Sequence, residues 1–287
     1  MALVEHSSFP DEQALLERIK QIKHVTLDLD GTIYKGNTLF PQTLPFLMQL
    51  KAMGIGYSFL TNNPSKSLSD YLSRFEKMGL QVTVDELYTS TQATICHLKT
   101  HLPAAKRLFI LGTPSMTGEF VKAGFVSAPD SADEIVDAVV VGFDMTLTYE
   151  RLCRAAWWIK NGKPFIATNP DGVCPTDQPT VWVDCGSICA ALEKATGRKP
   201  DVTLGKPQPE MMDGIFKTHK LYPCEVAMVG DRIYTDMLMA HRTGVLSVLV
   251  LSGEATLADA QKACPQPDMT IQHIGILGRL LANAKKV

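Results

Sequence analysis

Several features of other protein classes are missing from this sequence of 287 residues. No apolar run reaches the roughly 18 residues that a membrane-spanning helix needs, and the first residues lack the charged and then apolar layout of a secretory signal. The 28 basic and 30 acidic residues are scattered, so no Lys/Arg-rich stripe offers a surface for nucleic acid or lipid. These absences predict a soluble, cytoplasmic protein that binds neither a nucleic acid polymer nor a membrane.

Cysteine pairs of the kind that hold zinc or carry redox chemistry are also missing. The seven cysteines are an odd number, and none of them form a C-x-x-C pair. Cys185 and Cys189 lie four residues apart, as do His97 and His101, so each pair could share a helix face. No second pair lies near either of them, which disfavours a zinc site.

The composition is that of an ordinary globular protein, with 45% hydrophobic residues and no low-complexity linker. Short apolar segments alternate with helical patterns, which predicts a doubly wound α/β fold with parallel strands covered on both faces. Strands are expected at His24–Asp28, Gly56–Leu60, Leu108–Leu111, Ala138–Val141, Phe165–Ala167, Val226–Val229 and Leu246–Leu251. Helices are expected at Gln13–Ile22, Thr43–Lys51, Leu68–Met78, Thr91–His101, Tyr149–Lys160, Ser187–Ala195, Glu210–Thr218 and Tyr234–Ala240. The similarity of 54–64 to 162–171 indicates two αβ units of related design, the second in another α/β domain.

The first chemical signal is a pair of carboxylates at the end of an apolar strand. Asp28 and Asp30 are followed at once by Gly31 and Thr32. Because strand side chains alternate, two residues spaced by one start on the same side. Burying two anions together is costly unless a bound cation or a proton neutralises the charge. A polar turn, for which Asp-Gly is common, is the alternative.

Three further segments place polar groups after apolar strands or in tight turns. Thr61-Asn-Asn-Pro-Ser opens a helix, where backbone amides favour an anion, although simple N-capping is the alternative. Lys206 lies between glycine and proline, which suits a lysine held against a phosphate or carboxylate. An ordinary exposed lysine in a turn is the alternative. Asp231 follows another apolar strand, and Asp236 comes five residues later. Carboxylates, anion donors and a lysine together suit Mg²⁺-assisted phosphoryl transfer.

These segments resemble, in order, the four motifs of the haloacid dehalogenase superfamily. The segments are Leu27-Asp-Leu-Asp-Gly-Thr, Thr61-Asn-Asn, Lys206 and Gly230-Asp-x-x-x-Thr-Asp. The resemblance covers nearly the whole chain and is closest to the p-nitrophenyl phosphatase-like and NagD-like hydrolases of subclass IIA. Segments at 61–66, 167–171, 191–200 and 205–209 carry this likeness.

The resemblance implies a role for each motif. Asp28 is expected to be the nucleophile that forms an aspartyl-phosphate, and Asp30 the general acid and base. The phosphoryl group would be held by a second set: Thr61, the backbone amide of Asn62, the loop-bracing Asn63 and the charge-neutralising Lys206.

The resemblance also implies the ligands of Mg²⁺. These would be the Asp28 carboxylate, the backbone carbonyl of Asp30 and the Asp231 carboxylate. Asp236 would act as a further ligand, through water, or by orienting the catalytic lysine.

The spacing of the motifs locates an inserted lid. Only 33 residues separate Asp28 from Thr61, whereas 145 separate Thr61 from Lys206. The longer interval has room for an α/β cap of about a hundred residues. We therefore expect a Rossmann-like parallel-sheet core at 1–90 and 201–287, with a smaller α/β cap at 91–200 inserted between the second and third motifs.

The expected cap contains a candidate specificity loop, the turn Thr168–Gly172, in which Asn169 and Asp171 would contact substrate. A tight turn dictated by its Asn, Pro, Asp and Gly is the alternative. The chain departs from relatives at 181–187, where Trp182 and Asp184 lie near the expected rim of the cap and could contact substrate. An apolar core contact or a dimer contact is the alternative for Trp182.

The sequence thus predicts a Mg²⁺-dependent phosphatase for small phosphomonoesters. Nucleoside monophosphates, phosphoglycolate, sugar phosphates, pyridoxal phosphate and p-nitrophenyl phosphate are candidates among which no residue selects. The alternatives are a phosphotransferase with another acceptor and a non-catalytic protein that binds a phosphate ligand. Relatives often dimerise through the cap, so a homodimer of that kind, with Trp157 and Trp158 as candidate contacts, remains open.

Overall fold

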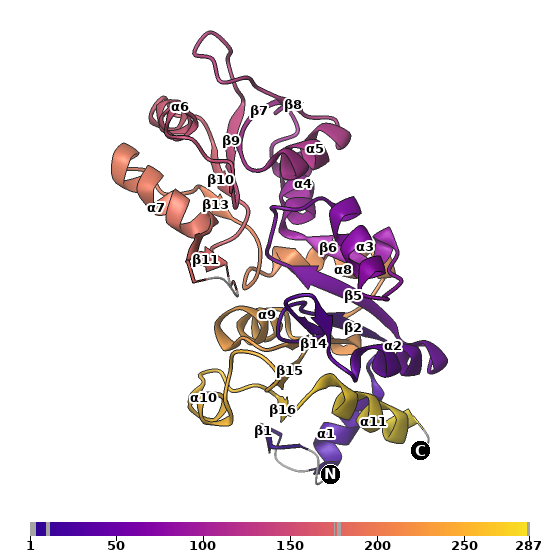
Figure 1. Ribbon diagram of the computed structural model, residues 1–287. Coiled ribbons are helices and arrows are strands. Elements are labelled where there is room, and N and C mark those ends of the chain that lie inside the picture. Colours follow the sequence, from indigo (N-terminus) through magenta and orange to yellow (C-terminus); the bar gives the residue numbers. More distant parts are fainter. Residues whose placement is uncertain (1–3, 10–11, 175, 177–178, 286–287) are drawn as a thin grey trace. The chain divides into compact units, whose positions relative to one another are not determined.

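The computed structural model describes residues 4–9, 12–174, 176 and 179–285, and its chain divides into two compact units (Figure 1). The seven-stranded unit comprises Met1–Leu60, Glu76–Tyr88 and Pro207–Val287. The five-stranded unit comprises Thr61–Phe75 and Thr89–Lys206. Each unit is built around its own sheet.

The sheet of the seven-stranded unit is mainly parallel. Its order is β1 (His6–Ser7), β16 (Met269–Ile271), β15 (Leu246–Val250), β14 (Val226–Gly230), β2 (His24–Leu27), β5 (Gly56–Thr61) and β6 (Leu87–Thr89). The strands from β16 to β5 run parallel, and β1 pairs antiparallel with β16. Every residue of β2, β14 and β15 is buried, because helices cover both faces of a parallel sheet.

Helix α11 packs against both α1 and α2 in this unit (Figure 1). The helices are α1 (Glu12–Lys20), α2 (Thr43–Ala52), α8 (Glu210–His219), α9 (Leu238–Thr243), α10 (Leu257–Lys262) and α11 (Ile274–Lys285). Short elements complete it: β3 (Tyr34–Lys35), β4 (Thr38–Leu39), the 3₁₀ turns Val84–Glu86 and Pro223–Glu225, and the π-turn Ile233–Met237.

The five-stranded unit has a parallel sheet with apolar residues on both faces. Its order is β13 (Val202–Thr203), β10 (Phe165–Ala167), β9 (Ala138–Val141), β7 (Arg107–Leu111) and β8 (Val126–Ser127). Alternate residues of β7, β9 and β10 belong to two separate cores, as the two-residue period of a strand requires. One core includes α4 (Ser90–His101) and α5 (Pro114–Lys122), the other α6 (Tyr149–Lys160) and α7 (Cys185–Thr196).

Two smaller elements accompany this sheet. The strands β11 (Val173–Cys174) and β12 (Trp182–Val183) pair antiparallel as a separate hairpin. Helix α3 (Leu68–Lys77) begins in the five-stranded unit and ends in the seven-stranded one. Within the described part of the chain, no helix is both long and apolar enough to cross a membrane.

The predicted α/β fold with parallel sheets is confirmed, and each expected strand is present. The ends of the expected elements differ from the observed ones by up to two residues, with one exception. The single helix expected at Tyr234–Ala240 is wrong, because the chain forms the π-turn before α9. There the Met237 amide donates to the carbonyl of Arg232, five residues back, at 3.2 Å.

The two similar segments of the sequence lie in different sheets. Residues 54–64 include β5 of the seven-stranded sheet, and residues 162–171 include β10 of the five-stranded sheet. This agrees with the interpretation that the second segment belongs to another α/β unit.

A buried histidine makes the stability of the seven-stranded unit depend on pH. His24 on β2 pairs with the Ser58 hydroxyl at 2.9 Å, and its ring lies 4.5 Å from that of His219. Burial, and secondarily the charge of His219, lowers the pKa of His24 from 6.5 to about 3. Between these values the unfolded chain binds a proton that the folded chain does not, so this contribution is complete above pH 6.5 and is lost as the pH falls towards 3.

We expect urea unfolding to show this loss. Between pH 6.5 and pH 5, His24 should remove about 2 kcal/mol from the free energy of unfolding of the wild type. The His24→Gln variant keeps an amide near the Ser58 hydroxyl but does not titrate, so its stability should fall less over the same interval. Equal pH slopes for the two proteins would contradict the assignment.

Candidate functional site

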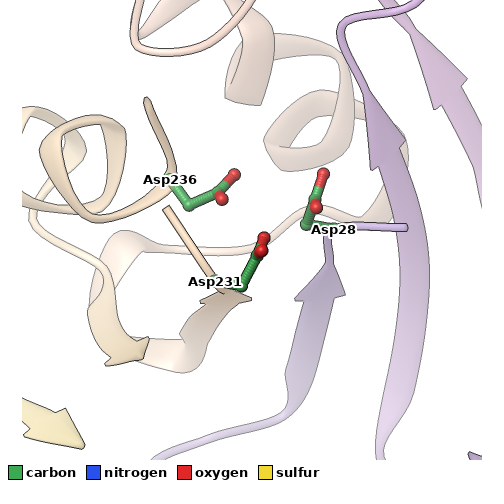
Figure 2. A group of neighbouring side chains, drawn as sticks. All are labelled: Asp28, Asp231 and Asp236. Carbon is green, nitrogen blue, oxygen red and sulfur yellow. The ribbon is translucent and has the colours of Figure 1, made fainter. Parts of the chain in front are cut away.

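Three carboxylates converge at one edge of the seven-stranded sheet. Asp28 follows β2, and Asp231 follows the neighbouring parallel strand β14. Asp236 lies in the π-turn after β14. One oxygen from each lies within 4.8 Å of the others, and Figure 2 shows the three side chains pointing toward one another. The sheet register explains this meeting, because the ends of parallel neighbours lie at the same edge.

The environment of Asp231 fits a divalent cation. This residue is 3% exposed, and its Oδ2 accepts a hydrogen bond from the Glu254 amide at 2.7 Å. Its Oδ1 is buried and has no hydrogen-bond partner among the described residues. Burial first, then the charges of Asp28 and Asp236, raises the pKa of Asp231 to about 7. A bound cation would relieve the repulsion between these carboxylates. Carboxylate oxygens are also the ligands that Mg²⁺ and Ca²⁺ prefer.

Two glycines leave room for the Asp231 carboxylate. A Cβ atom at Gly31 would lie 2.3 Å from Asp231 Oδ2, and one at Gly253 would lie only 1.9 Å from it. Gly31 also has a φ of +77°, which favours glycine. The Ser252 hydroxyl donates to the Gly31 carbonyl at 2.7 Å, so the two glycine loops are joined.

Asp30 lies in the turn that follows β2, outside the three-carboxylate cluster of the described residues. Between Asp28 and Asp30, Leu29 is buried, and its carbonyl accepts hydrogen bonds from the amides of Thr32 and Ile33 at 3.3 and 3.0 Å. The turn is therefore anchored by Leu29. The expected roles of Asp30 as acid and base and as a carbonyl ligand stay predictions.

The π-turn holds the third carboxylate. The Arg232 amide donates to Asp236 Oδ2 at 3.2 Å, and a Cβ atom at Gly230 would lie 2.3 Å from the Asp236 carboxyl carbon. A wide turn of this kind often occurs at functional sites because it redirects one side chain. Asp236 is thus placed with the proposed cation ligands, and its exact part stays a prediction.

In the five-stranded unit, Asn62 fixes the backbone of Lys206. The Lys206 amide donates to Asn62 Oδ1 at 2.6 Å, and Asn62 Nδ2 donates to the Lys206 carbonyl at 2.9 Å. Gly205 precedes the lysine with a φ of +76°, where a Cβ atom would lie 2.9 Å from Asn62 Oδ1. The side chain of the second motif therefore sets the position from which the lysine of the third motif extends.

The neighbours of Asn62 brace the same loop. The Thr61 hydroxyl accepts a hydrogen bond from the Asn63 amide at 3.2 Å. Asn63 Oδ1 accepts from both the amide and the hydroxyl of Ser65, at 2.9 and 2.7 Å. These contacts are compatible with the loop-bracing part expected of Asn63.

The expected specificity turn is linked to this loop. Asp171 Oδ2 accepts from Asn62 Nδ2 at 3.0 Å and from Asn169 Nδ2 at 3.4 Å. Asn169 also donates to Asp184 Oδ1 at 3.1 Å, and Asp184 accepts from the Cys185 amide at the start of α7. The structure thus brings Asn62, Lys206, Asn169 and Asp171 together, and gives Asp184 a helix-capping contact.

Trp182 lines an apolar pocket of the five-stranded unit. Its ring centroid lies 6.3 Å from that of Phe143. A cavity of about 430 Å³ is bounded by these two rings and by Met145, Leu147 and Val183. Packing therefore accounts for part of the Trp182 surface.

The loop after β15 contributes groups to the site that were not predicted from the sequence. Glu254 holds Asp231 through its amide, Gly253 makes room for the carboxylate, and Arg232 holds Asp236 through its amide. A signal was present in the sequence, because Ser252-Gly-Glu follows an apolar strand, and the end of a parallel strand lies at the same edge of the sheet as Asp231.

Comparison with known proteins identifies one family from two separate parts of the chain. A family model described as haloacid dehalogenase-like hydrolase matches residues 25–126, and a HAD-hydrolase-like model matches 203–277. The ribonucleotide monophosphatase NagD of Escherichia coli is 34% identical over 238 residues, which cover 83% of this chain and 91% of NagD.

Solved structures agree with this match. A 4-nitrophenylphosphatase from Thermotoga maritima superposes with a TM-score of 0.86 and 40% identity, covering 91% of this chain and 98% of that one. A glycerol phosphate phosphatase from Mycobacterium tuberculosis, in complex with magnesium, superposes with a TM-score of 0.82 and 29% identity, covering 92% of this chain and 77% of that one. The chain therefore belongs to the haloacid dehalogenase-like hydrolases, in their NagD-like and p-nitrophenylphosphatase-like subclass IIA.

Proposed function

We propose that this protein hydrolyses small-molecule phosphomonoesters with Mg²⁺ as its cation, through an aspartyl-phosphate on Asp28. Family membership makes the chain a phosphoric monoester hydrolase. The cation, the ester and the residue roles are our proposal. The observation that carries it is the meeting of Asp28, Asp231 and Asp236 around a buried Asp231 oxygen with no hydrogen-bond partner among the described residues.

The residues of the cluster suit a hard divalent cation. Its donors are carboxylate oxygens, without sulfur or imidazole, as Mg²⁺ prefers. We propose Asp28, Asp231 and the Asp30 carbonyl as ligands, with Asp236 as a further ligand or a partner through water. When bound, the cation supplies positive charge that offsets the phosphate oxygens and so permits attack by an anion.

The first chemical step that we propose transfers the phosphoryl group to Asp28. A carboxylate oxygen of Asp28 forms a bond to phosphorus while the bond from phosphorus to the ester oxygen breaks. Asp30, in its protonated form, gives its proton to the departing oxygen, which leaves as an alcohol.

The second step releases phosphate. Asp30, now a carboxylate, takes a proton from a water molecule as the water oxygen bonds to phosphorus. The bond between phosphorus and Asp28 breaks, and Asp28 returns to its carboxylate form as inorganic phosphate departs. One pair of carboxylates thus serves both halves of the reaction.

We propose that Thr61, the Asn62 amide and Lys206 bind the oxygens of the phosphoryl group. The paired hydrogen bonds between Asn62 and the Lys206 backbone support this proposal, because they restrict the path of a flexible lysine. We further propose residues 91–200 as the cap, and Asn169 and Asp171 of its turn as substrate contacts. The hydrogen bond between Asp171 and Asn62 would couple substrate binding at the turn to the position of the phosphate-binding loop.

The test is phosphate release with and without metal. The panel should contain a ribonucleoside monophosphate, glycerol phosphate, phosphoglycolate, a sugar phosphate, pyridoxal phosphate and p-nitrophenyl phosphate. We expect EDTA to abolish release and added Mg²⁺ to restore it, because unshielded carboxylates repel a phosphate ester. The ester with the highest kcat/KM indicates the substrate class. Release that persists in EDTA would contradict the cation assignment, and no release from any ester would contradict the hydrolase proposal.

A further inference from the structure

The side chains of Arg232 and Glu254 join the two loops whose backbones hold the cluster. The Arg232 amide donates to Asp236 Oδ2, and the Glu254 amide donates to Asp231 Oδ2. The same two residues form an ion pair with one another, Arg232 Nε to Glu254 Oε2 at 3.0 Å. The Tyr234 hydroxyl donates to that same Glu254 oxygen at 3.2 Å. One bridge therefore links the amides that orient two of the three carboxylates.

This bridge is poorly placed to contribute much to stability. The Glu254 side chain is 49% exposed and that of Arg232 is 22% exposed. Ion pairs with such exposure stabilise a fold only weakly, because water screens the two charges. The bridge can instead fix the positions of the cluster's carboxylates, because it joins the two loops. A shift of either loop would move a carboxylate oxygen of the cluster.

The positive charge of Arg232 allows an effect on ligand positioning to be distinguished from a purely electrostatic effect on cation binding. Burial by itself would lower the pKa of Arg232, but the charge of Asp28, and then those of Tyr234, Asp231 and Asp236, raise it above its usual value. The guanidinium is therefore a fixed positive charge near the cluster. If charge alone mattered, its removal would strengthen the binding of a cation, and removal of the Glu254 charge would weaken it.

We propose that the Arg232–Glu254 pair, with Tyr234, is a positioning device that holds Asp231 and Asp236 in the geometry for a divalent cation. The inference rests on the proposed cation site and goes beyond it to residues that orient the ligands. On this basis loss of either partner weakens cation binding, because either loss releases both loops. Groups that orient metal ligands typically change affinity by about 10- to 100-fold when they are replaced.

The experiment measures Mg²⁺ binding by isothermal titration calorimetry to metal-stripped, full-length protein. The variants are Arg232→Met, Glu254→Gln and the double variant, all of which keep the backbone amides. Lys23→Met is the matched control, because it removes an exposed ion pair with Glu225 in the same unit. We expect the Kd for Mg²⁺ to rise about 10-fold or more in both single variants. The double variant should bind no more weakly than the weaker single variant, since both changes break one bridge.

The outcomes separate this inference from the proposed function. Tighter Mg²⁺ binding by Arg232→Met would show that the arginine acts only through its charge, and would overturn the positioning role. Affinities equal to wild type would overturn it as well, as would a similar loss in Lys23→Met. Wild-type protein that binds no Mg²⁺ would remove the cation site and this inference with it. Normal Mg²⁺ binding without ester hydrolysis would contradict the proposed function alone. The melting temperature of each metal-stripped variant serves as the check on folding.

Discussion

Asp28→Asn should abolish phosphate release while leaving the protein folded. An amide nitrogen or oxygen cannot replace the carboxylate as nucleophile, so kcat should fall by on the order of 10⁴-fold or more. The change also removes one of the charges that raise the pKa of the buried Asp231. Less repulsion within the cluster should leave the melting temperature of the metal-stripped protein at or above that of the wild type. Phosphate release and thermal unfolding, measured on the same sample, check both parts.

Asp30→Asn is the matched control for this prediction. It removes the proposed acid and base but leaves the proposed nucleophile in place. With p-nitrophenyl phosphate, whose leaving group departs with little protonation, this variant should release a burst of about one p-nitrophenolate per site and then stall. Asp28→Asn should show no burst. A burst from Asp28→Asn, or turnover near that of wild type, would contradict the nucleophile assignment.

Gly253→Ala should strongly weaken cation binding although it replaces none of the proposed ligands. The new Cβ atom would lie 1.9 Å from Asp231 Oδ2 and 2.4 Å from its carboxyl carbon. Real Cβ atoms do not approach so closely, so the loop or the carboxylate must move. A shift of this size at a ligand should weaken Mg²⁺ binding by about 100-fold or more and lower kcat/KM in parallel. Calorimetric titration with Mg²⁺ measures the first effect directly.

Gly118→Ala is the control for the added methyl group. A Cβ atom at this position in α5 meets no atom within 4 Å. Alanine also favours a helix over glycine by up to about 1 kcal/mol, so this variant should be as stable as the wild type or more so and should bind Mg²⁺ normally. Unchanged Mg²⁺ affinity in Gly253→Ala would mean that the Asp231 carboxylate tolerates displacement, and would contradict its role as a ligand held in place.

The elements that the sequence predicted well are those with local signals. The strands β9 and β14 are apolar throughout, and such runs indicate strands covered on both faces. Helix α11 was missed because Gly275 and Gly278 interrupt its pattern. At Gly278 a Cβ atom would lie 2.4 Å from the Gln49 side chain on α2, so this glycine serves the packing of two helices distant in sequence. No local pattern contains that information.

In the candidate site, too, some features could be predicted from the sequence and others only from the tertiary structure. The sequence by itself determined the four motifs and their order, because carboxylates and amides at strand ends are read residue by residue. It also determined the family, since those motifs lie at characteristic spacings. Only the tertiary structure decided which groups meet. The register of β2 beside β14 brings Asp28 to Asp231, and the π-turn turns Asp236 toward them.

The parts that only the fold could show are contacts between segments far apart in the chain. Glu254 reaches Asp231 because β15 and β14 are parallel neighbours, and Asn62 binds the Lys206 backbone across 144 positions of sequence. Such contacts produce no periodic pattern in the sequence, because they use backbone amides and carbonyls, which do not depend on the type of side chain. The sequence therefore determined which chemical groups the protein carries, and the packing of its strands decided how they are held.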